Sequence, residues 1–433
     1  MGLVMLIENN IKDKKIELTM NVLFSGIGCQ ERGIENTKLF NVNIVSTAEI
    51  SKEAVLSYAA VHCNLTQEMI DTYTEYPTRE EMARQLTEIN LGYDVEKDKA
   101  QDWYKVAKKK TNEINKYWLA NKISHNLGDI GKITELPYAD LWTISFCCQD
   151  ISTAGKMKGL KPDSGTRSSL LWENIRLLKK AIEDKTAPKY LLFENVKNLV
   201  SKKFIDDYNK LLEILKELGY NSYWKVLNAK NCGIPQNRER VFVICIRKDI
   251  DKVAFTFPEP FDNGLRLKDM LEEEDVDESY YIENEKALEI IKENEKGSTL
   301  KYRIRKLTAI ECWKLMGMTA EDNKSASKLG VSNTQLYKQA GNGIVTNCIE
   351  LLFEHLYKAQ YNKEYKCYDE RVYNEQNECK VKIEGNIYPS GGQNGNIINV
   401  NGISTTISAG IGNSGNGVGS NNAPKILINE NFM

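Results

Sequence analysis

The sequence predicts an α/β fold built on a doubly wound, mostly parallel sheet. A first strand over 20–24 breaks at a glycine turn into a helix from about Gln30, and a second strand over 43–48 leads into a helix over 51–61 capped by Ser51. The strongly apolar run Leu141–Phe146 is typical of a strand buried on both faces of a parallel sheet. Strand, turn and helix repeated at this spacing indicate crossovers between parallel strands.

The remaining elements continue this pattern after one interruption. We expect a helix over 168–182, a strand over 190–193, a helix over 204–218, and an edge hairpin of strands over 223–227 and 241–246. Residues 272–296 carry eleven Asp or Glu against three Lys and are expected to be helical. Their charge would repel phosphate. Amphipathic segments over 305–318 and 344–358 are predicted as helices, with a lead-in to the first, packing on the sheet domain.

Two segments depart from the α/β pattern. Residues 64–126 have helical periodicity and hold lysines interleaved with aromatic residues, which favours a solvated helical insertion packing its aromatics inward, with a nucleic-acid contact surface as the second interpretation. Beyond about Glu384 the chain is rich in Gly, Asn and Ser, and the runs 396–400, 403–407 and 425–428 could be short strands. A flexible tail and a small β module both fit this region.

Composition limits the classes of function. Ten Cys without a C-x-x-C spacing and three His argue against a zinc site and a disulfide scaffold, so we expect no metal and a reducing cytoplasm. No run approaches the roughly 18 apolar residues needed to span a bilayer, so no membrane association is expected. The net charge of −2 gives no hint of a nucleic-acid partner, which must be argued from local features.

A candidate cofactor site follows the first two strands. The turn Phe24-Ser25-Gly26-Ile27-Gly28 lacks the third glycine of a dinucleotide motif, because Glu31 stands there. An acid, Glu49, ends the next strand, where such folds bind ribose hydroxyls. These features favour a nucleoside cofactor without a pyrophosphate, such as S-adenosylmethionine, over the dinucleotide of an oxidoreductase. The strand over 141–146 runs into Cys147-Cys148, and these thiols alone could be structural or reactive.

The order of the motifs carries a resemblance. FSGIG, an acid, GDI, CCQDIS, GTRSSL, ENV, QNRER, RKLTAIECWKLMGM and QAGNGIV follow one another as in the cytosine-C5 DNA methyltransferase family, over most of residues 20–247 and 303–358. The resemblance implies a Rossmann-like methyltransferase fold, S-adenosylmethionine as cofactor, no metal, double-stranded DNA as partner and a cognate restriction endonuclease as a candidate second partner. It implies methylation of carbon 5 of a flipped-out cytosine.

The resemblance also assigns roles to residues. Cys148 corresponds to the nucleophile, Glu194 to the acid that contacts the base, and Arg238 and Arg240 to the arginines beside base and backbone, with Arg240 in the active pocket. The cofactor-binding positions fall on Phe24, Gly26, Ile27, Gly28, Glu49, Ile50, Asp129, Ile130, Asn342 and Ile344. Glu49 would bind ribose and Asp129 the adenine amino group.

The sequence departs from the family pattern at three places. Cys147 replaces the usual proline before the nucleophile, and Gly343 replaces the usual serine. The interval 241–304, where the family holds its variable DNA-reading domain, is short and partly acidic. We therefore hypothesise that recognition resides in 380–433, assisted by the insertion, which truncation at about residue 380 would test.

The sequence thus predicts five regions. A catalytic domain comprises 18–63 and 127–250, with the helical insertion over 64–126, an acidic connector over 251–302, C-terminal motifs over 303–360 and a recognition module over 380–433. A tRNA cytosine-C5 methyltransferase of the same fold and a DNA-binding protein with an inactive site, favoured by Cys147 and Gly343, are the alternative functions.

Overall fold

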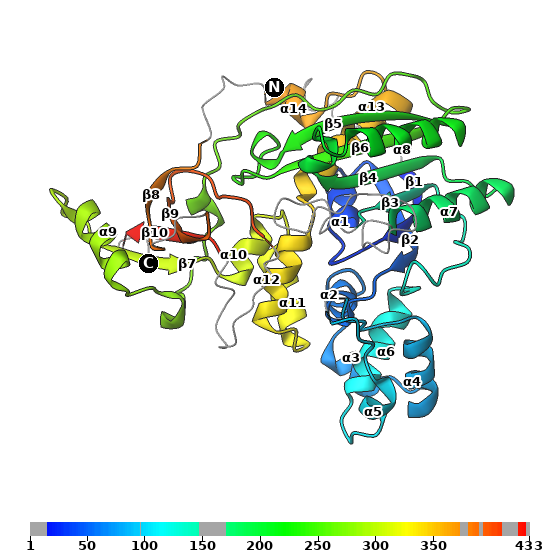
Figure 1. The fold of residues 1–433 in the computed structure, drawn as a ribbon, viewed down its shortest axis with the longest axis horizontal. Helices are drawn as coiled ribbons and strands as arrows, with labels where there is room; N and C mark the ends of the chain where they lie inside the picture. Colours follow the sequence, from blue (N-terminus) through cyan, green and yellow to red (C-terminus); the bar gives the residue numbers. More distant parts are fainter. Residues whose placement is uncertain are drawn as a thin grey trace, which may run out of the picture.

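The computed structural model describes residues 15–95, 97–146, 170–372, 380–388, 393–408 and 423–429. In this part of the chain a six-stranded sheet has the order β2-β1-β3-β4-β6-β5, and a four-stranded sheet stands apart from it (Figure 1). The larger sheet contains β1 (Ile16–Leu23), β2 (Phe40–Ala48), β3 (Leu141–Ile144), β4 (Tyr190–Val196), β5 (Tyr220–Asn228) and β6 (Glu239–Arg247). Strands β1 to β4 are parallel, whereas β6 runs antiparallel to both of its neighbours. The predicted α/β fold and edge hairpin are confirmed.

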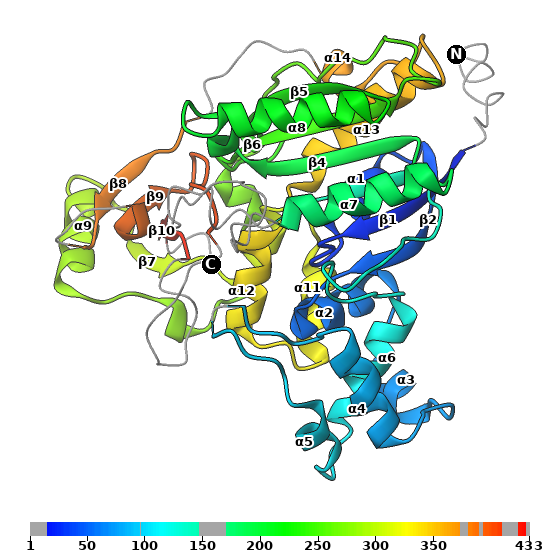
Figure 2. The same cartoon turned by 45° about the vertical axis from the view of Figure 1, so that its right-hand side comes forward.

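Two hydrophobic cores cover the two faces of this sheet. Helices α7 (Leu170–Glu183) and α8 (Ile205–Glu217) pack on one face with Leu191 and Phe193 of β4, and α1 (Cys29–Asn36), α2 (Lys52–His62) and α13 (Thr346–Gln360) contribute to the other with Leu192 (Figure 2). Alternate residues of β4 therefore enter opposite cores, as the period of a strand requires. Burial on both faces explains why β3 and β4 are almost wholly apolar.

The insertion after α2 is helical, as predicted. It contains α3 (Gln67–Thr72), α4 (Arg79–Glu88), α5 (Trp103–Ala107) and α6 (Glu113–Ile123), which form a lobe beside α2 (Figure 1). Trp103 is buried and donates through its indole nitrogen to the Leu91 carbonyl at 2.7 Å, and Trp118 donates to the Gln85 side chain at 2.7 Å. Trp103, Tyr117 and Trp118 thus pack inward, whereas Tyr104 and the lysines 108–110 are exposed.

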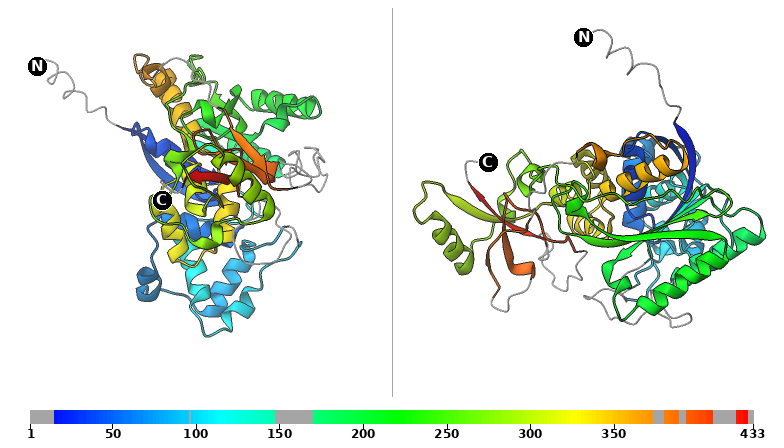
Figure 3. Two further views of the ribbon diagram at one scale, coloured as in Figure 1. Left: turned by 90° about the vertical axis from the view of Figure 1, so that its left-hand side faces the viewer. Right: turned by 90° about the horizontal axis from the view of Figure 1, so that it is seen from above.

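The second sheet joins two segments that are far apart in the sequence. Its order is β7 (Tyr302–Lys306), β10 (Lys425–Asn429), β9 (Asn396–Asn399) and β8 (Ile383–Asn386), and α9 (Glu285–Glu295) packs against it through Ala287 (Figure 3). The helix with its lead-in expected over 305–318 is in fact strand β7 followed by the short helix α10 (Ala309–Lys314). The helix expected over 272–296 is limited to α9. The run 403–407 makes one isolated bridge, at Ser404, and is not a strand of this sheet.

Three helices lie between the two sheets, and a buried ion pair joins the first of these helices to β7. Helices α10, α11 (Ala320–Lys328) and α12 (Asn333–Asn342) lie between them in Figure 1. At the junction of β7 and α10, Arg305 and Glu311 form two hydrogen bonds of 2.8 and 2.7 Å, with side chains 2% and 0% exposed. Glu311 also accepts a hydrogen bond from the Thr308 amide at 2.8 Å, so it closes the N-terminus of α10.

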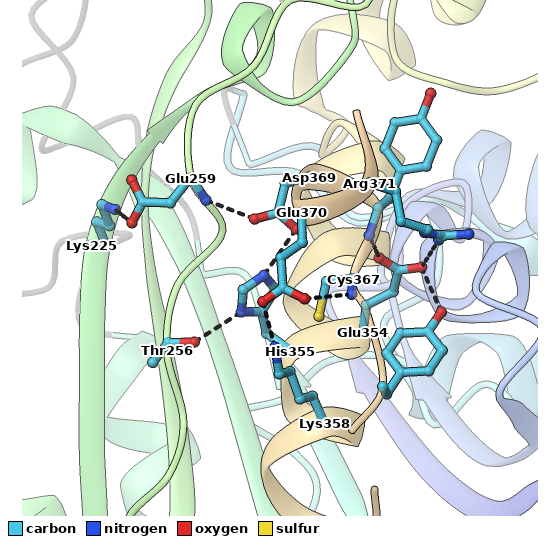
Figure 4. A network of polar contacts seen from close by, with 12 residues as sticks. Lys225, Thr256, Glu259, Glu354, His355, Lys358, Cys367, Asp369, Glu370 and Arg371 are labelled. Atoms are coloured by element: carbon cyan, nitrogen blue, oxygen red, sulfur yellow. Dashed lines mark hydrogen bonds and ion pairs between the residues drawn. The ribbon is translucent and has the colours of Figure 1, made fainter. Parts of the chain in front are cut away.

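The end of α13 is fastened to the chain that follows β6. His355 contacts the Thr256 hydroxyl through Nδ1 at 3.0 Å and Asp369 through Nε2 at 3.1 Å, and the Glu259 amide donates to the second oxygen of Asp369 at 3.0 Å (Figure 4). Asp369 belongs to the one-turn helix α14 (Tyr368–Arg371). Within the described residues, no helix is long and apolar enough to cross a membrane.

Candidate active site

The turn after β1 has the backbone conformation that its glycines allow. Phe24, Gly26 and Gly28 all have positive φ angles, of 60°, 55° and 78°. A Cβ on Gly26 would enter open space, with nothing within 4 Å, whereas a Cβ on Gly28 would overlap the imidazole of His62. Gly26 therefore leaves room for a ligand, and Gly28 is needed for internal packing. Ile27 is buried, and its carbonyl contacts His62 Nε2 at 3.1 Å.

Glu49 closes this turn from the end of β2. Its carboxylate accepts hydrogen bonds from the Gly26 amide at 3.1 Å and the Ser51 amide at 2.8 Å. Burial raises the pKa of Glu49, and the two amide donors act in the opposite direction. Asn126 binds the Glu49 backbone on both sides, accepting from its nitrogen at 2.8 Å and donating to its oxygen at 3.0 Å. Ile50, which follows, accepts from the Gly92 amide at 2.6 Å.

Asp129 lies in a turn that the insertion holds. One carboxylate oxygen accepts from the Gly131 amide at 2.9 Å, and the other accepts from the Asn90 side chain at 2.9 Å. The Asp129 amide donates to the Ile89 carbonyl at 3.0 Å, and a Cβ on Gly128 would overlap that same carbonyl. The helical insertion therefore shapes this part of the site. Ile130 is buried behind it.

The fourth cofactor segment follows α12. Asn342 is exposed and Ile344 is buried, so these neighbours face different surroundings. A Cβ on Gly343 would stand 3.2 Å from the sulfur of Cys29 and 3.3 Å from the Gln339 carbonyl, both tighter than ordinary contacts. The space that a serine side chain would need here is thus limited by Cys29, which accounts for glycine at this position.

These segments meet at the end of the large sheet where strands β1 and β2 finish. The turn and Glu49 follow the adjacent strands β1 and β2. Residues 126–130 reach the same end of the sheet because Asn126 forms a bridge with Thr47 of β2 and the Leu127 amide donates to the Thr47 carbonyl at 2.8 Å. The open space at Gly26, with the partly exposed carboxylates Glu49 and Asp129 at the same end of the sheet, suits a nucleoside with hydroxyl and amino groups. The residues present therefore fit the S-adenosylmethionine that the sequence implied.

Glu194 and Arg240 form a second polar centre on β4 and β6. Glu194 lies opposite Phe242, and Arg240 lies opposite Val196, in the antiparallel register of the two strands. Arg240 Nε stands 3.2 Å from the Glu194 carboxylate, with side chains 17% and 11% exposed. Burial raises the pKa of Glu194 more than Arg240 and Arg238 lower it. The site therefore holds a carboxyl group suited to keeping its proton, next to a fixed positive charge.

Asn195 links this centre to the strand that precedes Cys148. Its side-chain amide donates to the Phe146 carbonyl at 2.9 Å, and its side-chain oxygen accepts from the Val196 amide at 2.9 Å. Asn195 is buried, and Phe146 stands two residues after the end of β3. Cys147 and Cys148, the predicted nucleophile, lie outside the described residues, which end before them at Phe146.

The Arg238 guanidinium donates to main-chain carbonyls of three residues. It donates to Gly341 at 2.9 Å, Gly343 at 2.8 Å and Ile407 at 2.7 Å, and the residue is 3% exposed. It thus joins the turn after α12 to the C-terminal segment. Of the two arginines expected beside base and backbone, Arg240 lies with Glu194 and Arg238 contacts main-chain carbonyls of this protein.

Sequence reasoning missed several side chains that support the site. Asn126, His62, Asn90 and Asn195 carry no signal of their own, because each acts through a contact with a distant segment. Only Asn195 stood within a recognised motif.

One group of metal-type donors occurs in the described part of the chain. His355, Cys367 and Asp369 are buried, and their donor atoms lie within 4.8 Å of one another. Both nitrogens of His355 and both oxygens of Asp369 already have protein partners (Figure 4). The polar groups of His355 and Asp369 are therefore satisfied by the protein itself.

Comparison with known proteins identifies the class. A family model described as C-5 cytosine-specific DNA methylase matches residues 89–299 and 282–358. The chain belongs to this family and is a DNA (cytosine-5-)-methyltransferase, for which S-adenosylmethionine is the implied methyl donor.

Its relatives include bacterial enzymes of known designation. The type II methyltransferase M2.ScrFI of Lactococcus lactis subsp. cremoris is 39% identical over 374 residues, covering 78% of this chain and 98% of that protein. The orphan methyltransferase M.SssI of Spiroplasma monobiae is 37% identical over 243 residues, covering 54% of this chain and 61% of that protein. The type II methyltransferase M.HhaI of Haemophilus parahaemolyticus is 29% identical over 273 residues, covering 52% and 78%.

Proposed function

We propose that this methyltransferase modifies cytosine within a specific double-stranded DNA sequence through a covalent adduct of Cys148. Carbon 5 of cytosine is too weak a nucleophile to accept a methyl group directly. Addition of a thiolate to carbon 6 turns the ring into an enamine, so electron density becomes available at carbon 5. Carbon 5 would then form a bond to the methyl carbon while the electron pair of the broken carbon–sulfur bond stays on the sulfur of the donor. A base would remove the proton from carbon 5, and elimination of the thiolate would restore the aromatic ring and the free enzyme. The cytosine must leave the duplex for these steps.

Glu194 and Arg240 are proposed to bind the flipped base. A protonated Glu194 would donate to ring nitrogen 3 and stabilise the charge that thiolate addition places there, which its raised pKa supports. Arg240, held at 3.2 Å from Glu194, would orient the carbonyl of the base and offset negative charge. Asn195 would fix the start of the nucleophile loop by holding the Phe146 carbonyl.

The end of the large sheet that holds the turn after β1, Glu49 and Asp129 is proposed to bind the methyl donor. S-adenosylmethionine supplies a methyl group made electrophilic by its sulfonium. The Gly26 backbone would allow its close approach, Glu49 would accept from ribose hydroxyls and Asp129 from the adenine amino group. The support for this assignment is the open space at Gly26 and the partial exposure of both carboxylates.

The second sheet and its connections are proposed to read the DNA sequence. This extends the recognition region beyond the predicted 380–433, because β8, β9 and β10 share their sheet with β7 and their core with α9. Since type II methyltransferases are among the relatives, a cognate endonuclease recognising the same site is proposed as a partner in the cell.

The observation that carries the proposal is the Glu194–Arg240 pair near the end of β4. Asn195, the residue after Glu194 in the same strand, hydrogen-bonds the carbonyl of Phe146, two positions before Cys148. Duplex DNA containing 5-fluorocytosine tests it, because fluorine at carbon 5 blocks the elimination. We expect wild-type and Cys147→Ser proteins to form a covalent adduct and Cys148→Ser to form none. An adduct that persists in Cys148→Ser, or no adduct in the wild type, would refute the mechanism.

Parallel assays separate the alternatives. Methyl transfer to duplex DNA and to tRNA should be compared, followed by bisulfite sequencing of the DNA product. We expect methylated cytosines within one short sequence. Methylation of tRNA alone would favour the tRNA enzyme, and tight DNA binding without methylation would favour the inactive binding protein.

A further inference from the structure

The segment Ile403–Ile407 leaves the second sheet and lies along the QNRER motif. The Ser404 amide donates to the Pro235 carbonyl at 2.8 Å, and the Asn237 amide donates to the Ser404 carbonyl at 2.8 Å. The Thr406 hydroxyl donates to the Asn237 carbonyl at 2.6 Å. Ser404 and Gln236 are fully buried at this bridge. A segment about 170 positions away in sequence thus completes the backbone hydrogen bonds of the motif.

Two motif side chains carry this contact further into the protein. Gln236 accepts from the Ile407 amide at 3.3 Å and donates to the Leu315 carbonyl at 2.8 Å, behind α10. Arg238 donates to the Ile407 carbonyl on one side and, on the other, to the carbonyls of Gly341 and Gly343 at the end of α12. Two residues beyond Arg238, β6 presents Arg240 to Glu194. The Arg238 guanidinium therefore hydrogen-bonds the C-terminal segment to Gly341 and Gly343, and Arg238 stands two residues before the Arg240 that pairs with Glu194.

We propose that Ile403–Ile407 is a positioning segment of the catalytic centre, acting through Arg238 on the Gly341–Ile344 turn and on the Glu194–Arg240 pair. This inference rests on the proposed function, because it assigns the segment to the chemistry of that site as well as to the recognition sheet. Buried carbonyls without donors are costly, so one guanidinium that serves three of them fixes the relative positions of the segments that carry them. Binding of the second sheet to DNA would therefore change the geometry around the base through this segment.

Arg238→Lys is the first test, because a lysine keeps the charge but cannot serve three carbonyls with a rigid fork. We expect the single-turnover rate per active site to fall at least about tenfold, the factor that corresponds to losing one hydrogen bond to a charged group. Affinity for S-adenosylmethionine should fall as well, with DNA affinity within about twofold. Active sites are counted by 5-fluorocytosine trapping, so loss of folded protein alone would not lower this rate.

Arg79→Lys is the matched control. Arg79 also donates to three carbonyls, of Ala107, Lys109 and Thr111, at 2.8 to 2.9 Å, but these lie in the helical insertion. We expect its rate per active site to stay within about twofold of the wild type. Equal losses in Arg79→Lys and Arg238→Lys would overturn the proposal, since any disturbed carbonyl clamp would then suffice.

The segment can also be tested from its own side. Thr406→Val removes the hydroxyl that binds the Asn237 carbonyl at nearly constant shape, Thr406→Ser retains it, and Thr405→Val changes the adjacent residue. We expect a severalfold loss of single-turnover rate in Thr406→Val only, with rescue in Thr406→Ser. A wild-type rate in both Thr406→Val and Arg238→Lys would refute the proposal.

Hydrogen exchange separates this inference from the proposed function, because it needs no substrate. Arg238→Lys should raise exchange jointly at amides of 403–407 and 341–346, whereas Arg79→Lys should raise it only in the insertion. If the wild type fails to methylate DNA, the proposed function fails while the linked exchange still supports the mechanical link. If exchange rises at only one of the two segments, the link itself is refuted.

Discussion

The two glycines of the cofactor turn are needed for different reasons, and this difference can be measured. Gly28→Ala places a Cβ on a residue with φ of 78° and into the ring of His62. The left-handed conformation costs an alanine about 1–2 kcal/mol. Overlap with a packed side chain adds about 1–3 kcal/mol. The two costs together predict that the free energy of unfolding falls by about 2–5 kcal/mol, a large share of the roughly 5–15 kcal/mol typical of a folded protein.

A double-mutant cycle separates the two costs. In a His62→Ala background the ring is gone, so Gly28→Ala should lose only the conformational cost of about 1–2 kcal/mol. The cycle should therefore give a coupling energy of about 1–3 kcal/mol between Gly28 and His62, measured from urea denaturation curves of the four proteins. Gly26→Ala is the control, because its Cβ meets nothing within 4 Å and should not couple to His62.

The same cycle has a functional readout and a clear point of failure. Gly26→Ala should weaken S-adenosylmethionine binding in calorimetric titration, since its Cβ enters the space assigned to the cofactor, while its stability falls by only about 1–2 kcal/mol. Additivity of Gly28→Ala and His62→Ala within about 0.5 kcal/mol would show that the ring does not limit position 28. Unchanged affinity in Gly26→Ala would show that the open space is not the cofactor site.

Three further perturbations follow from the site. Glu194→Gln should slow methyl transfer about 100-fold or more. The wild-type rate should fall as pH rises through the raised pKa of Glu194, because the acid form is required. The glutamine variant should lose this limb of the pH–rate profile. Asn195→Ala leaves the buried Phe146 carbonyl without its donor, so stability should fall by about 1–3 kcal/mol and 5-fluorocytosine trapping should slow; trapping at the wild-type rate would contradict the anchoring role. Glu311→Gln should destabilise the protein by about 3–5 kcal/mol in urea denaturation by leaving Arg305 buried without its partner, and Arg305→Met in the same protein should recover much of that loss.

The catalytic sheet was predictable because each of its strands carries a local signal. Strand β3 and residues 190–193 of β4 are almost wholly apolar, and polar residues mark where each apolar run ends. In the second sheet a local signal marks only β9 and β10, which fall on the runs 396–400 and 425–428 expected as strands. Its β7, Tyr-Arg-Ile-Arg-Lys, alternates as a strand does, but it runs directly into the helical periodicity of α10 and so was assigned to that helix. Its partner β10 lies about 120 positions later, and such pairing is not encoded locally.

The candidate site was predictable to a similar extent. The carboxylates Glu49, Asp129 and Glu194 stand at strand or turn ends, where function-bearing groups are expected. The supporting contacts were not predictable, because Asn126 and Arg238 act on backbone groups supplied by other parts of the chain. Arg238 shows the difference most clearly. The motif resemblance places Arg238 and Arg240 together beside base and backbone, whereas burial and three carbonyl acceptors make Arg238 a link between segments.

This link changes how the recognition region can be tested. Truncation at residue 380 would remove β10, the strand that pairs with β7, and would expose the apolar side chain of Ile304 in their shared core. It would also remove the Ile407 carbonyl from Arg238 and the Ser404 bridge from the QNRER motif. Loss of methylation would then follow from damage to the catalytic centre even if the second sheet never touched DNA. Recognition must therefore be tested by substituting exposed side chains of the second sheet within the intact chain. A change in the methylated sequence at an unchanged rate per active site would establish the reading role, and an unchanged sequence across such substitutions would refute it.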